Sequence, residues 1–215
     1  MITIKKFIVN PIQVNTFILH DETKKCVIID AGCFSEQEQL ALVNYLEQNE
    51  LKLEKLLITH GHFDHILGNK FLAQKYNVAL YGHKDDEKLI KNLVPYAASF
   101  GFSVAESVLI DNYLNDGDEV TFGNSTLKVL HVPGHSAGSL VYYSAEGGFA
   151  IVGDVLFKGS IGRTDLVDGN LDLLLSGIAT KLYTLPDETG IFPGHGAATD
   201  IGYEKTHNPF TLDIY

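Results

Sequence analysis

Three histidines and one aspartate lie within six residues of one another, at His60, His62, Asp64 and His65. Neutral imidazole and carboxylate groups are ligands that suit divalent transition metals. Alternate side chains on extended backbone point to opposite sides, so His60 and His62 share a metal only if the chain turns between them. Gly61 makes such a turn easy, and Asp64 and His65 are expected to begin a helix that aims them differently. The run is therefore predicted to serve two adjacent metal positions.

Three more candidate ligands occur in loops that directly follow predicted strands, and each has a glycine close by. Glycine permits close approach of the backbone, and a ligand at a strand end is held on a rigid frame. The candidates are His135 after a strand predicted over 126–131, Asp154 after 149–152 and His195 after 190–192. A lone histidine is usually structural, but this many ligand-type residues at such positions indicate a metal centre.

The hydrophobic pattern predicts the elements that position these residues. Ser35 and Glu38 form a capping-box pattern before a helix, and apolar residues then recur at helical spacing. Strands are predicted over 2–9, 14–20, 26–30, 53–58, 78–81, 119–122, 126–131, 139–144, 149–152 and 190–192. Helices are predicted over 36–49, 65–76, 84–92, 171–183 and 198–206, and 93–112 is expected to be irregular.

Each half of the chain is a run of strands with helices. This order favours two sheets packed face to face with helices outside, an α/β (α+β) fold. The first three strands are expected to be antiparallel. No Pro/Ser-rich linker separates the halves, so one domain over 1–215 is predicted.

Composition and charge exclude several classes of function. The formal net charge of −11 argues against bulk nucleic-acid binding, which requires Lys and Arg to neutralise phosphates. No apolar run approaches the roughly 18–20 residues of a membrane span, and the N-terminus lacks a secretory pattern. With two cysteines, a disulfide framework is not expected. We therefore expect a cytoplasmic protein that binds no nucleic acid and no membrane; the sequence does not indicate its oligomeric state.

These motifs resemble, over nearly the whole chain, those of the metallo-β-lactamase superfamily, whose fold is an αββα four-layer sandwich. The resemblance implies two divalent metal ions, zinc in the first instance, with iron or manganese as alternatives. It assigns His60, His62 and His135 to the first metal, Asp64, His65 and His195 to the second, and Asp154 to a bridge between them. It also implies that Asp64, besides binding metal, orients the nucleophile, which makes it the candidate catalytic residue.

Asp154 narrows the resemblance within the superfamily. Zinc β-lactamases tend to carry a cysteine at that position, whereas an acidic bridge is typical of other branches. The segments 134–139, 153–157, 162–166 and 193–196 look most like a compact bacterial glyoxalase II-like (hydroxyacylglutathione hydrolase-like) subgroup. The implied activity is hydrolysis of a small-molecule thioester by a metal-bound hydroxide. Larger glyoxalase II enzymes carry a helical domain with glutathione-binding residues beyond the last histidine, and little chain follows His195 here, so the thiol carrier stays open.

Two basic residues are candidates for substrate binding. Arg163 lies nine residues after Asp154 in a glycine-flanked loop, where it either meets a substrate carboxylate or pairs with Asp165. Lys158 is a candidate of the same kind. Asp30, at a strand end, is expected to bond nearby backbone, with a hydrogen bond to a ligand histidine as the alternative. His20, His83, His131 and His207 are expected to be structural or surface residues.

Three other functions are compatible with the fold. A persulfide dioxygenase-like oxidoreductase would hold one iron with His60, His135 and Asp154 and leave positions open for oxygen. A nuclease would need a basic groove, which the acidic composition opposes. A non-catalytic binding module would be expected to lack some of the ligands, and all of them are present. Counting bound metals distinguishes the first of these from a two-metal hydrolase.

Overall fold

The first half of the chain forms one six-stranded sheet in the order β1-β2-β3-β4-β5-β6. The structure is a computed structural model that describes residues 1–214. Strands β1, β2 and β3 are antiparallel, as predicted, whereas β3 to β6 run parallel. The strands are β1 (Thr3–Val9), β2 (Val14–His20), β3 (Lys25–Ile29), β4 (Lys52–Leu57), β5 (Leu80–Gly82) and β6 (Asn112–Tyr113).

The second half forms another six-stranded sheet, in the order β14-β13-β10-β9-β8-β7. Its neighbours are antiparallel except for β10 and β13. The strands are β7 (Glu119–Phe122), β8 (Ser125–His131), β9 (Leu140–Ser144), β10 (Phe149–Gly153), β13 (Gly190–Pro193) and β14 (Thr199–Asp200). A short hairpin of β11 (Leu156–Phe157) and β12 (Ser160–Ile161) forms a separate pair.

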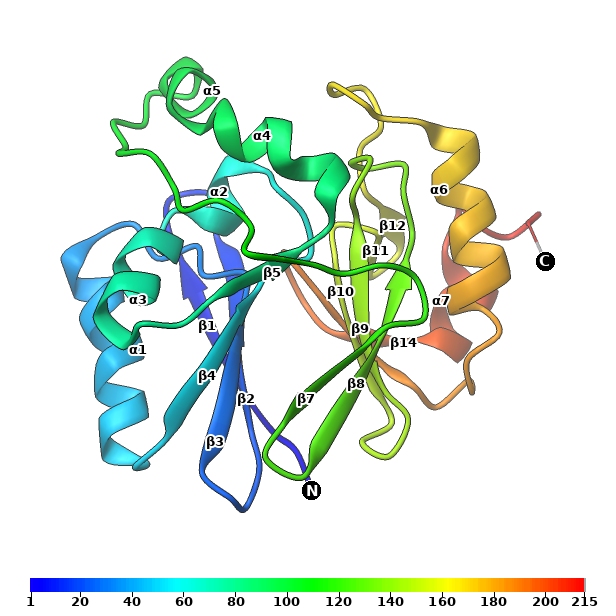
Figure 1. Cartoon of the computed structure of the whole chain (residues 1–215). Coiled ribbons are helices and arrows are strands. Elements are labelled where there is room, and N and C mark those ends of the chain that lie inside the picture. Colours follow the sequence, from blue (N-terminus) through cyan, green and yellow to red (C-terminus); the bar gives the residue numbers. More distant parts are fainter. Residues whose placement is uncertain (215) are drawn as a thin grey trace.

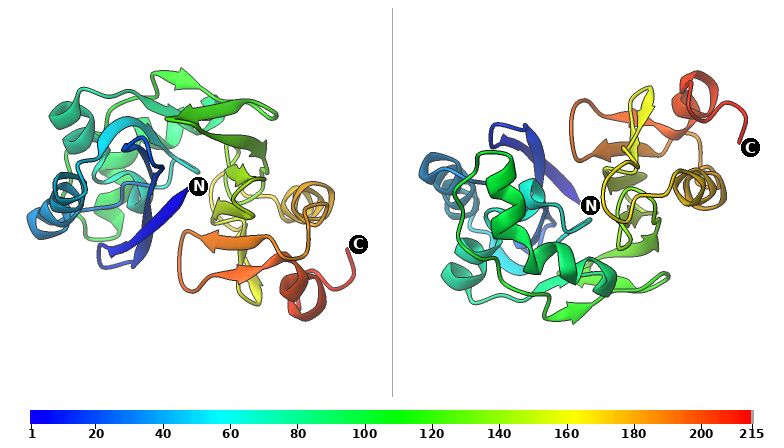
Figure 2. Two further views of the ribbon diagram at one scale, coloured as in Figure 1. Left: turned by 90° about the horizontal axis from the view of Figure 1, so that it is seen from below. Right: turned by 90° about the horizontal axis from the view of Figure 1, so that it is seen from above.

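The alternation of apolar side chains along the strands produces the layers. In β2, Phe17 and Leu19 belong to a buried cluster with Phe122 and Tyr142 of the second sheet, while the intervening Ile18 belongs to the cluster that packs against helices. Helices therefore lie on the two outer faces, and the sheets meet in the middle (Figures 1 and 2). This is the αββα four-layer sandwich of the α/β class that the sequence predicts.

The helices divide between the outer faces and one end of the sandwich. Helices α1 and α3 cover the first sheet, and α6 and α7 cover the second, while α4 and α5 lie across one end (Figure 1). The helices are α1 (Glu36–Gln48), α2 (Phe63–Ile66), α3 (Asn69–Tyr76), η1 (Lys84–Asp86), α4 (Glu87–Lys91), α5 (Leu93–Ser99), α6 (Leu171–Gly177), η2 (Ile178–Leu182) and α7 (Ile201–His207). Within residues 1–214, none of them is long and apolar enough to cross a membrane.

The structure corrects the predicted helices at several places. The helix expected over 65–76 is broken into α2 and α3, because the N–H of Gly68 donates to the carbonyl of Ala31 at 2.7 Å and a side chain there would collide with Cys33. The prediction that 93–112 is irregular is wrong for α5, whose Leu93 and Ala97, one turn apart, are both buried. The predicted capping box of Ser35 and Glu38 is confirmed at the start of α1.

Candidate metal centre

The segment after β4, a loop followed by α2, carries four of the candidate ligands. His62 is the residue before α2, and Asp64 and His65 lie within α2, so the start of this helix aims them differently from His60. The turn brings Gly61 against Asp86: the N–H of Gly61 donates to the carboxylate at 2.8 Å, and a Cβ on Gly61 would lie 2.9 Å from the Asp86 carbonyl oxygen. A glycine is needed here because of this close approach.

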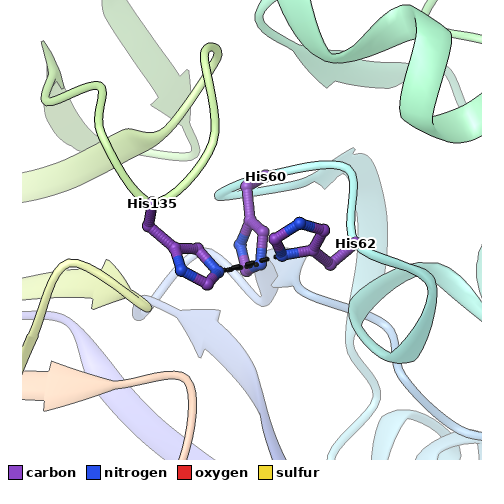
Figure 3. A group of neighbouring side chains, drawn as sticks. All are labelled: His60, His62 and His135. Carbon is purple, nitrogen blue, oxygen red and sulfur yellow. Dashed lines mark hydrogen bonds between the residues drawn. The ribbon is translucent and has the colours of Figure 1, made fainter. Parts of the chain in front are cut away.

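His60 and His62 meet His135, which the loop after β8 supplies from the other sheet. His135 Nε2 lies 2.9 Å from His62 Nδ1 and 3.3 Å from His60 Nε2, so the three ring nitrogens point toward one another (Figure 3). All three side chains are buried. Three imidazoles converging in this way form a set of donors that suits one divalent transition metal.

A second group consists of Asp64, His65 and His195. His195 Nε2 lies 3.3 Å from His65 Nε2 and 3.3 Å from Asp64 Oδ2. His195 comes from the loop after β13, and β2 holds this loop in place because the N–H of Asn15 donates to the carbonyl of Gly194 at 2.7 Å. The mixed nitrogen and oxygen donors suit a second divalent ion.

Asp154 lies between the two groups. Its Oδ2 is 3.6 Å from both His135 Nε2 and His195 Nε2, and its Oδ1 is 3.6 Å from His65 Nε2. Oδ1 is buried and has no hydrogen-bond partner among the described residues. A buried carboxylate oxygen without a donor is energetically unfavourable unless a cation neutralises it. The residues present therefore fit a pair of divalent ions with Asp154 between them, and we propose all seven residues as the ligands.

Gly194 is required for this approach of Asp154. A Cβ at Gly194 would collide with Asp154 Oδ1 and lie 2.7 Å from His65 Cε1. We expect Gly194→Ala to lower metal content to about half or less, because overpacking of this kind displaces side chains. Elemental analysis after dialysis measures this. Gly190→Ala, at the start of the preceding strand β13, is the control, since the nearest atom to its Cβ would be 3.5 Å away. Full metal occupancy in Gly194→Ala would contradict the assignment.

Burial leaves His60 and His62 uncharged. It lowers the pKa of His62 to about 3 and holds the pKa of His60 well below its ordinary value, and the neighbouring histidines add to both effects. Both imidazoles are therefore neutral at pH 7. A neutral imidazole has a lone pair available for a metal ion.

The second group has the opposite electrostatic character. Burial acts to lower the pKa of His65, but the carboxylates of Asp64, Asp154 and Asp30 outweigh it and raise that pKa to about 10. Burial acts to raise the pKa of Asp64, but His65 and His195 bring it to about 2. The carboxylates thus stabilise a positive charge beside His65, and either a proton on His65 or a bound cation provides it.

Hydrogen bonds behind the candidate ligands fix their orientation. Asp30 Oδ2 lies 3.0 Å from His65 Nδ1, and Asp30 Oδ1 accepts the N–H of Thr59 at 2.7 Å. Asp30 therefore makes both of the contacts considered from the sequence, one with backbone and one with a candidate ligand histidine. His135 Nδ1 donates to the carbonyl of Arg163 at 2.8 Å. The bonds to His65 Nδ1 and His135 Nδ1 hold these two rings so that their Nε2 atoms point toward the candidate metal positions.

Asp86 is a positioning residue that the sequence analysis missed. It is 1% exposed, and its carboxylate accepts hydrogen bonds from Gly61 N at 2.8 Å, Ser136 Oγ at 2.8 Å and Gly138 N at 2.7 Å. It thereby joins the loop of His60 to the loop of His135. The available signal was its position just after β5, because β5 runs parallel to β4 and the carboxyl ends of parallel strands meet at one edge.

A cavity of about 170 Å³ opens onto the candidate ligands. Its other walls are Ile12, Phe63, Tyr96, Phe100, Arg163 and Leu166. Arg163 is thus at the cavity and also pairs with Asp165, with Nε 2.7 Å from Oδ1 and Nη2 2.8 Å from Oδ2. The structure does not bring Lys158 to this cavity: its Nζ lies 5.5 Å from the ring centre of Tyr203 in α7.

The four other histidines lie outside these groups. His83 and His131 stack on each other with ring centres 4.1 Å apart, and His20 Nε2 lies 3.1 Å from the hydroxyl of Tyr45. His207 stacks on Tyr203. No potential metal-binding group within residues 1–214 includes any of the four.

Several known proteins are similar to this chain. The chain matches the model of the metallo-beta-lactamase superfamily over residues 9–195, a span that contains every candidate ligand. Hydroxyacylglutathione hydrolase GloC of Haemophilus influenzae is 37% identical, over 94% of each chain. The crystal structure of BLEG-1 B3 metallo-beta-lactamase has a TM-score of 0.89 at 35% identity, covering 97% of this chain and 99% of that one. TTHA1623, solved in a di-iron-bound form, has a TM-score of 0.86 at 32% identity, covering 96% and 99%.

Proposed function

The chain belongs to the metallo-beta-lactamase superfamily, and from that premise we propose that it is a dinuclear metallohydrolase that cleaves thioesters. The observation that carries the proposal is Asp154, whose carboxylate faces both groups of candidate ligands and has one buried oxygen, Oδ1, without a hydrogen-bond partner among the described residues. A pair of divalent ions supplies an activated water near neutral pH and polarises a carbonyl group.

The residues of the chain supply positioning and proton control. The pKa of Asp64, about 2, keeps this carboxylate ionised, so it can accept a hydrogen bond from the attacking water and orient it. Phe63, Tyr96 and Phe100 form an aromatic wall beside the candidate ligands, against which an apolar part of the substrate can pack. Arg163 offers a guanidinium at the same cavity for a substrate carboxylate.

The walls of the cavity favour direct attack by water over a covalent intermediate. Among the described residues that line it, none is serine, threonine or cysteine. A serine, threonine or cysteine nucleophile is therefore absent from the described residues at the place where the substrate would bind. The cavity instead presents carboxylates and imidazoles, which suits hydrolysis assisted by metal ions.

We propose a hydroxyacyl thioester of glutathione as the substrate and zinc as the metal. The name of the relative from Haemophilus influenzae, 37% identical over nearly the full length of both chains, supports the substrate. Imidazole and carboxylate ligands suit zinc, but the same ligands also bind iron, and TTHA1623 has been solved with two irons. A cytoplasmic location would fit such a substrate.

The experiment that tests the function is purification without chelator, elemental analysis, and an assay of several thioesters with the released thiol as readout. We expect about two metals per chain and hydrolysis of S-lactoylglutathione. The protein adds no thiol signal of its own, because Cys26 and Cys33 are buried and burial raises the pKa of each to about 12. A penicillin serves as the comparison substrate.

Two results would overturn the proposal. Absence of hydrolysis across the thioester panel would remove the thioesterase activity. One iron per chain with thiol-dependent consumption of oxygen would instead establish the dioxygenase alternative predicted from the sequence. The second group of candidate ligands, Asp64, His65 and His195, speaks for two metals because its donor atoms already converge.

A further inference from the structure

A second cavity, of about 280 Å³, adjoins the candidate metal centre. It lies between α4 and the loop that precedes α6, at the end of the sandwich where Figure 1 shows both segments. Its walls are His62, Lys88, Leu89, Asn92, Tyr96 and Val167. His62 and Tyr96 also line the cavity at the candidate metals. Because the two cavities share these walls, they lie next to each other, with Tyr96 and His62 between them.

The wall between the cavities is held firmly. The ring of Tyr96 packs edge-on against Phe63 and Phe100, with ring centres 5.7 Å and 5.3 Å apart, and its centre is 6.4 Å from that of His62. Edge-to-face contacts of this kind stabilise this orientation of the ring. The second cavity is therefore a feature of the packed structure.

The second cavity combines apolar walls with one cation. Leu89, Val167 and the ring of Tyr96 are apolar, and Val167 is 65% exposed. The cation is Lys88, whose Nζ lies 2.5 Å from Asp168 Oδ2. This ion pair is partly exposed, which makes it weak and exchangeable with another carboxylate.

One loop supplies the partners of both cations that face the two cavities. Asp165 pairs with Arg163 at the metal-site cavity, and Asp168 pairs with Lys88 at the second cavity. Each aspartate occupies the position where the carboxylate of a ligand would bind. A ligand that spans both cavities and carries more than one carboxylate therefore meets a cation at each of them.

We propose that the second cavity binds the thiol-carrier half of the thioester, and that Lys88 pairs with a carboxylate of that carrier. This inference rests on the proposed thioesterase function. The smaller cavity at the metals suits a short acyl group, whereas the larger one suits a longer carrier with apolar stretches and an anionic end. A carrier of peptide-like thiol chemistry has these properties. Lys88, on α4, thus takes the role that the sequence analysis gave to Lys158.

Lys88→Gln tests the proposal because it removes the charge from an exposed residue without disturbing the fold. Lys91→Gln is the matched control: Lys91 is on the same helix, pairs with Glu87 at 2.8 Å and does not line the cavity. Each variant is assayed with S-lactoylglutathione and with the lactoyl thioester of N-acetylcysteamine, whose carrier is short and uncharged. Binding of S-methylglutathione is measured in parallel by calorimetry.

For Lys88→Gln we expect KM for S-lactoylglutathione to rise about 5-fold with kcat unchanged, as for the loss of one partly exposed ion pair. We expect no change with the N-acetylcysteamine thioester, and no change in Lys91→Gln with either substrate. The Kd of S-methylglutathione should rise by the same factor. Val167→Asp, which places a carboxylate at the mouth, should also raise KM for S-lactoylglutathione.

The proposal and the proposed function fail in different ways. If the wild-type protein hydrolyses both thioesters and Lys88→Gln changes neither KM nor Kd, the second cavity does not bind the carrier. An equal change with both thioesters likewise overturns the proposal, because it shows a general effect or binding of the acyl group. If the wild-type protein hydrolyses neither thioester, the proposed function fails, and the carrier site is then tested by calorimetry alone. Binding of S-methylglutathione that is weakened in Lys88→Gln supports the carrier site. Binding that is the same in Lys88→Gln, or no binding to the wild-type protein, overturns it.

Discussion

The Asp64→Asn variant is expected to lose thioester hydrolysis, with kcat falling by roughly 10²–10⁴-fold. Asparagine keeps the shape of the side chain, but its amide is a weak metal ligand and a poor acceptor for a proton. In the structure, Asp64 is 8% exposed, faces the cavity and has its Oδ2 3.3 Å from His195 Nε2. The change therefore removes a negative charge from the point where the second group of ligands and the attacking water would meet.

Turnover of S-lactoylglutathione and bound metal are measured on the same preparation of Asp64→Asn. A fall to about one metal per chain identifies Asp64 chiefly as a ligand, whereas two retained metals identify it chiefly as the residue that orients water. Asp187→Asn is the control, because Asp187 is exposed and pairs with Lys205 away from the cavity. Wild-type activity in Asp64→Asn would refute the assigned site.

The second large effect is expected for Asp86→Ala, which should lower the free energy of unfolding by about 3 kcal/mol. The carboxylate of Asp86 accepts bonds from Gly61 N, Ser136 Oγ and Gly138 N within the buried interior. Alanine leaves these donors without an acceptor and frees two loops that hold candidate ligands. Metal affinity should fall by about 10–100-fold, as is typical when groups behind metal ligands are removed.

Urea unfolding of the metal-free protein measures the first effect of Asp86→Ala, and competition with a chelator measures the second. Asp85→Ala is the matched control, since Asp85 is the adjacent residue, lies at the surface and should change stability by at most about 0.5 kcal/mol. The stability of Asp86→Asn should lie between those of Asp86→Ala and Asp85→Ala, because its amide oxygen still accepts a hydrogen bond but its NH₂ group faces other donors. A midpoint equal to wild type in Asp86→Ala would show that the loops do not depend on this carboxylate.

Much of the fold follows from local patterns. The alternation of apolar residues in β2 and the capping box at Ser35 predict the strands and helices, and their order predicts the four layers. The predictions failed where a contact between distant segments decides the local structure. The helix is interrupted between α2 and α3 because Gly68 packs against Ala31 and Cys33, which lie on another segment. The helix α5 was missed because its burial depends on the core beneath it.

The sequence by itself determined the chemistry of the opening motif. His60, His62, Asp64 and His65 are close because they are close in the chain, so their spacing alone indicates a metal site. Only the tertiary structure decided how the rest of the centre assembles. His135, Asp154 and His195 come from loops of the second sheet, and the distances that join them to the motif depend on how the two sheets face each other.

The same distinction explains which supporting residues were missed. Asp86 and Lys88 both follow β5, so this position alone does not tell the buried carboxylate apart from the exposed lysine. Packing buries Asp86 between two ligand loops, whereas it places Lys88 at the mouth of a cavity. The type of a side chain is a local property, but its burial and its partners are set by long-range contacts, and these decide what the side chain does.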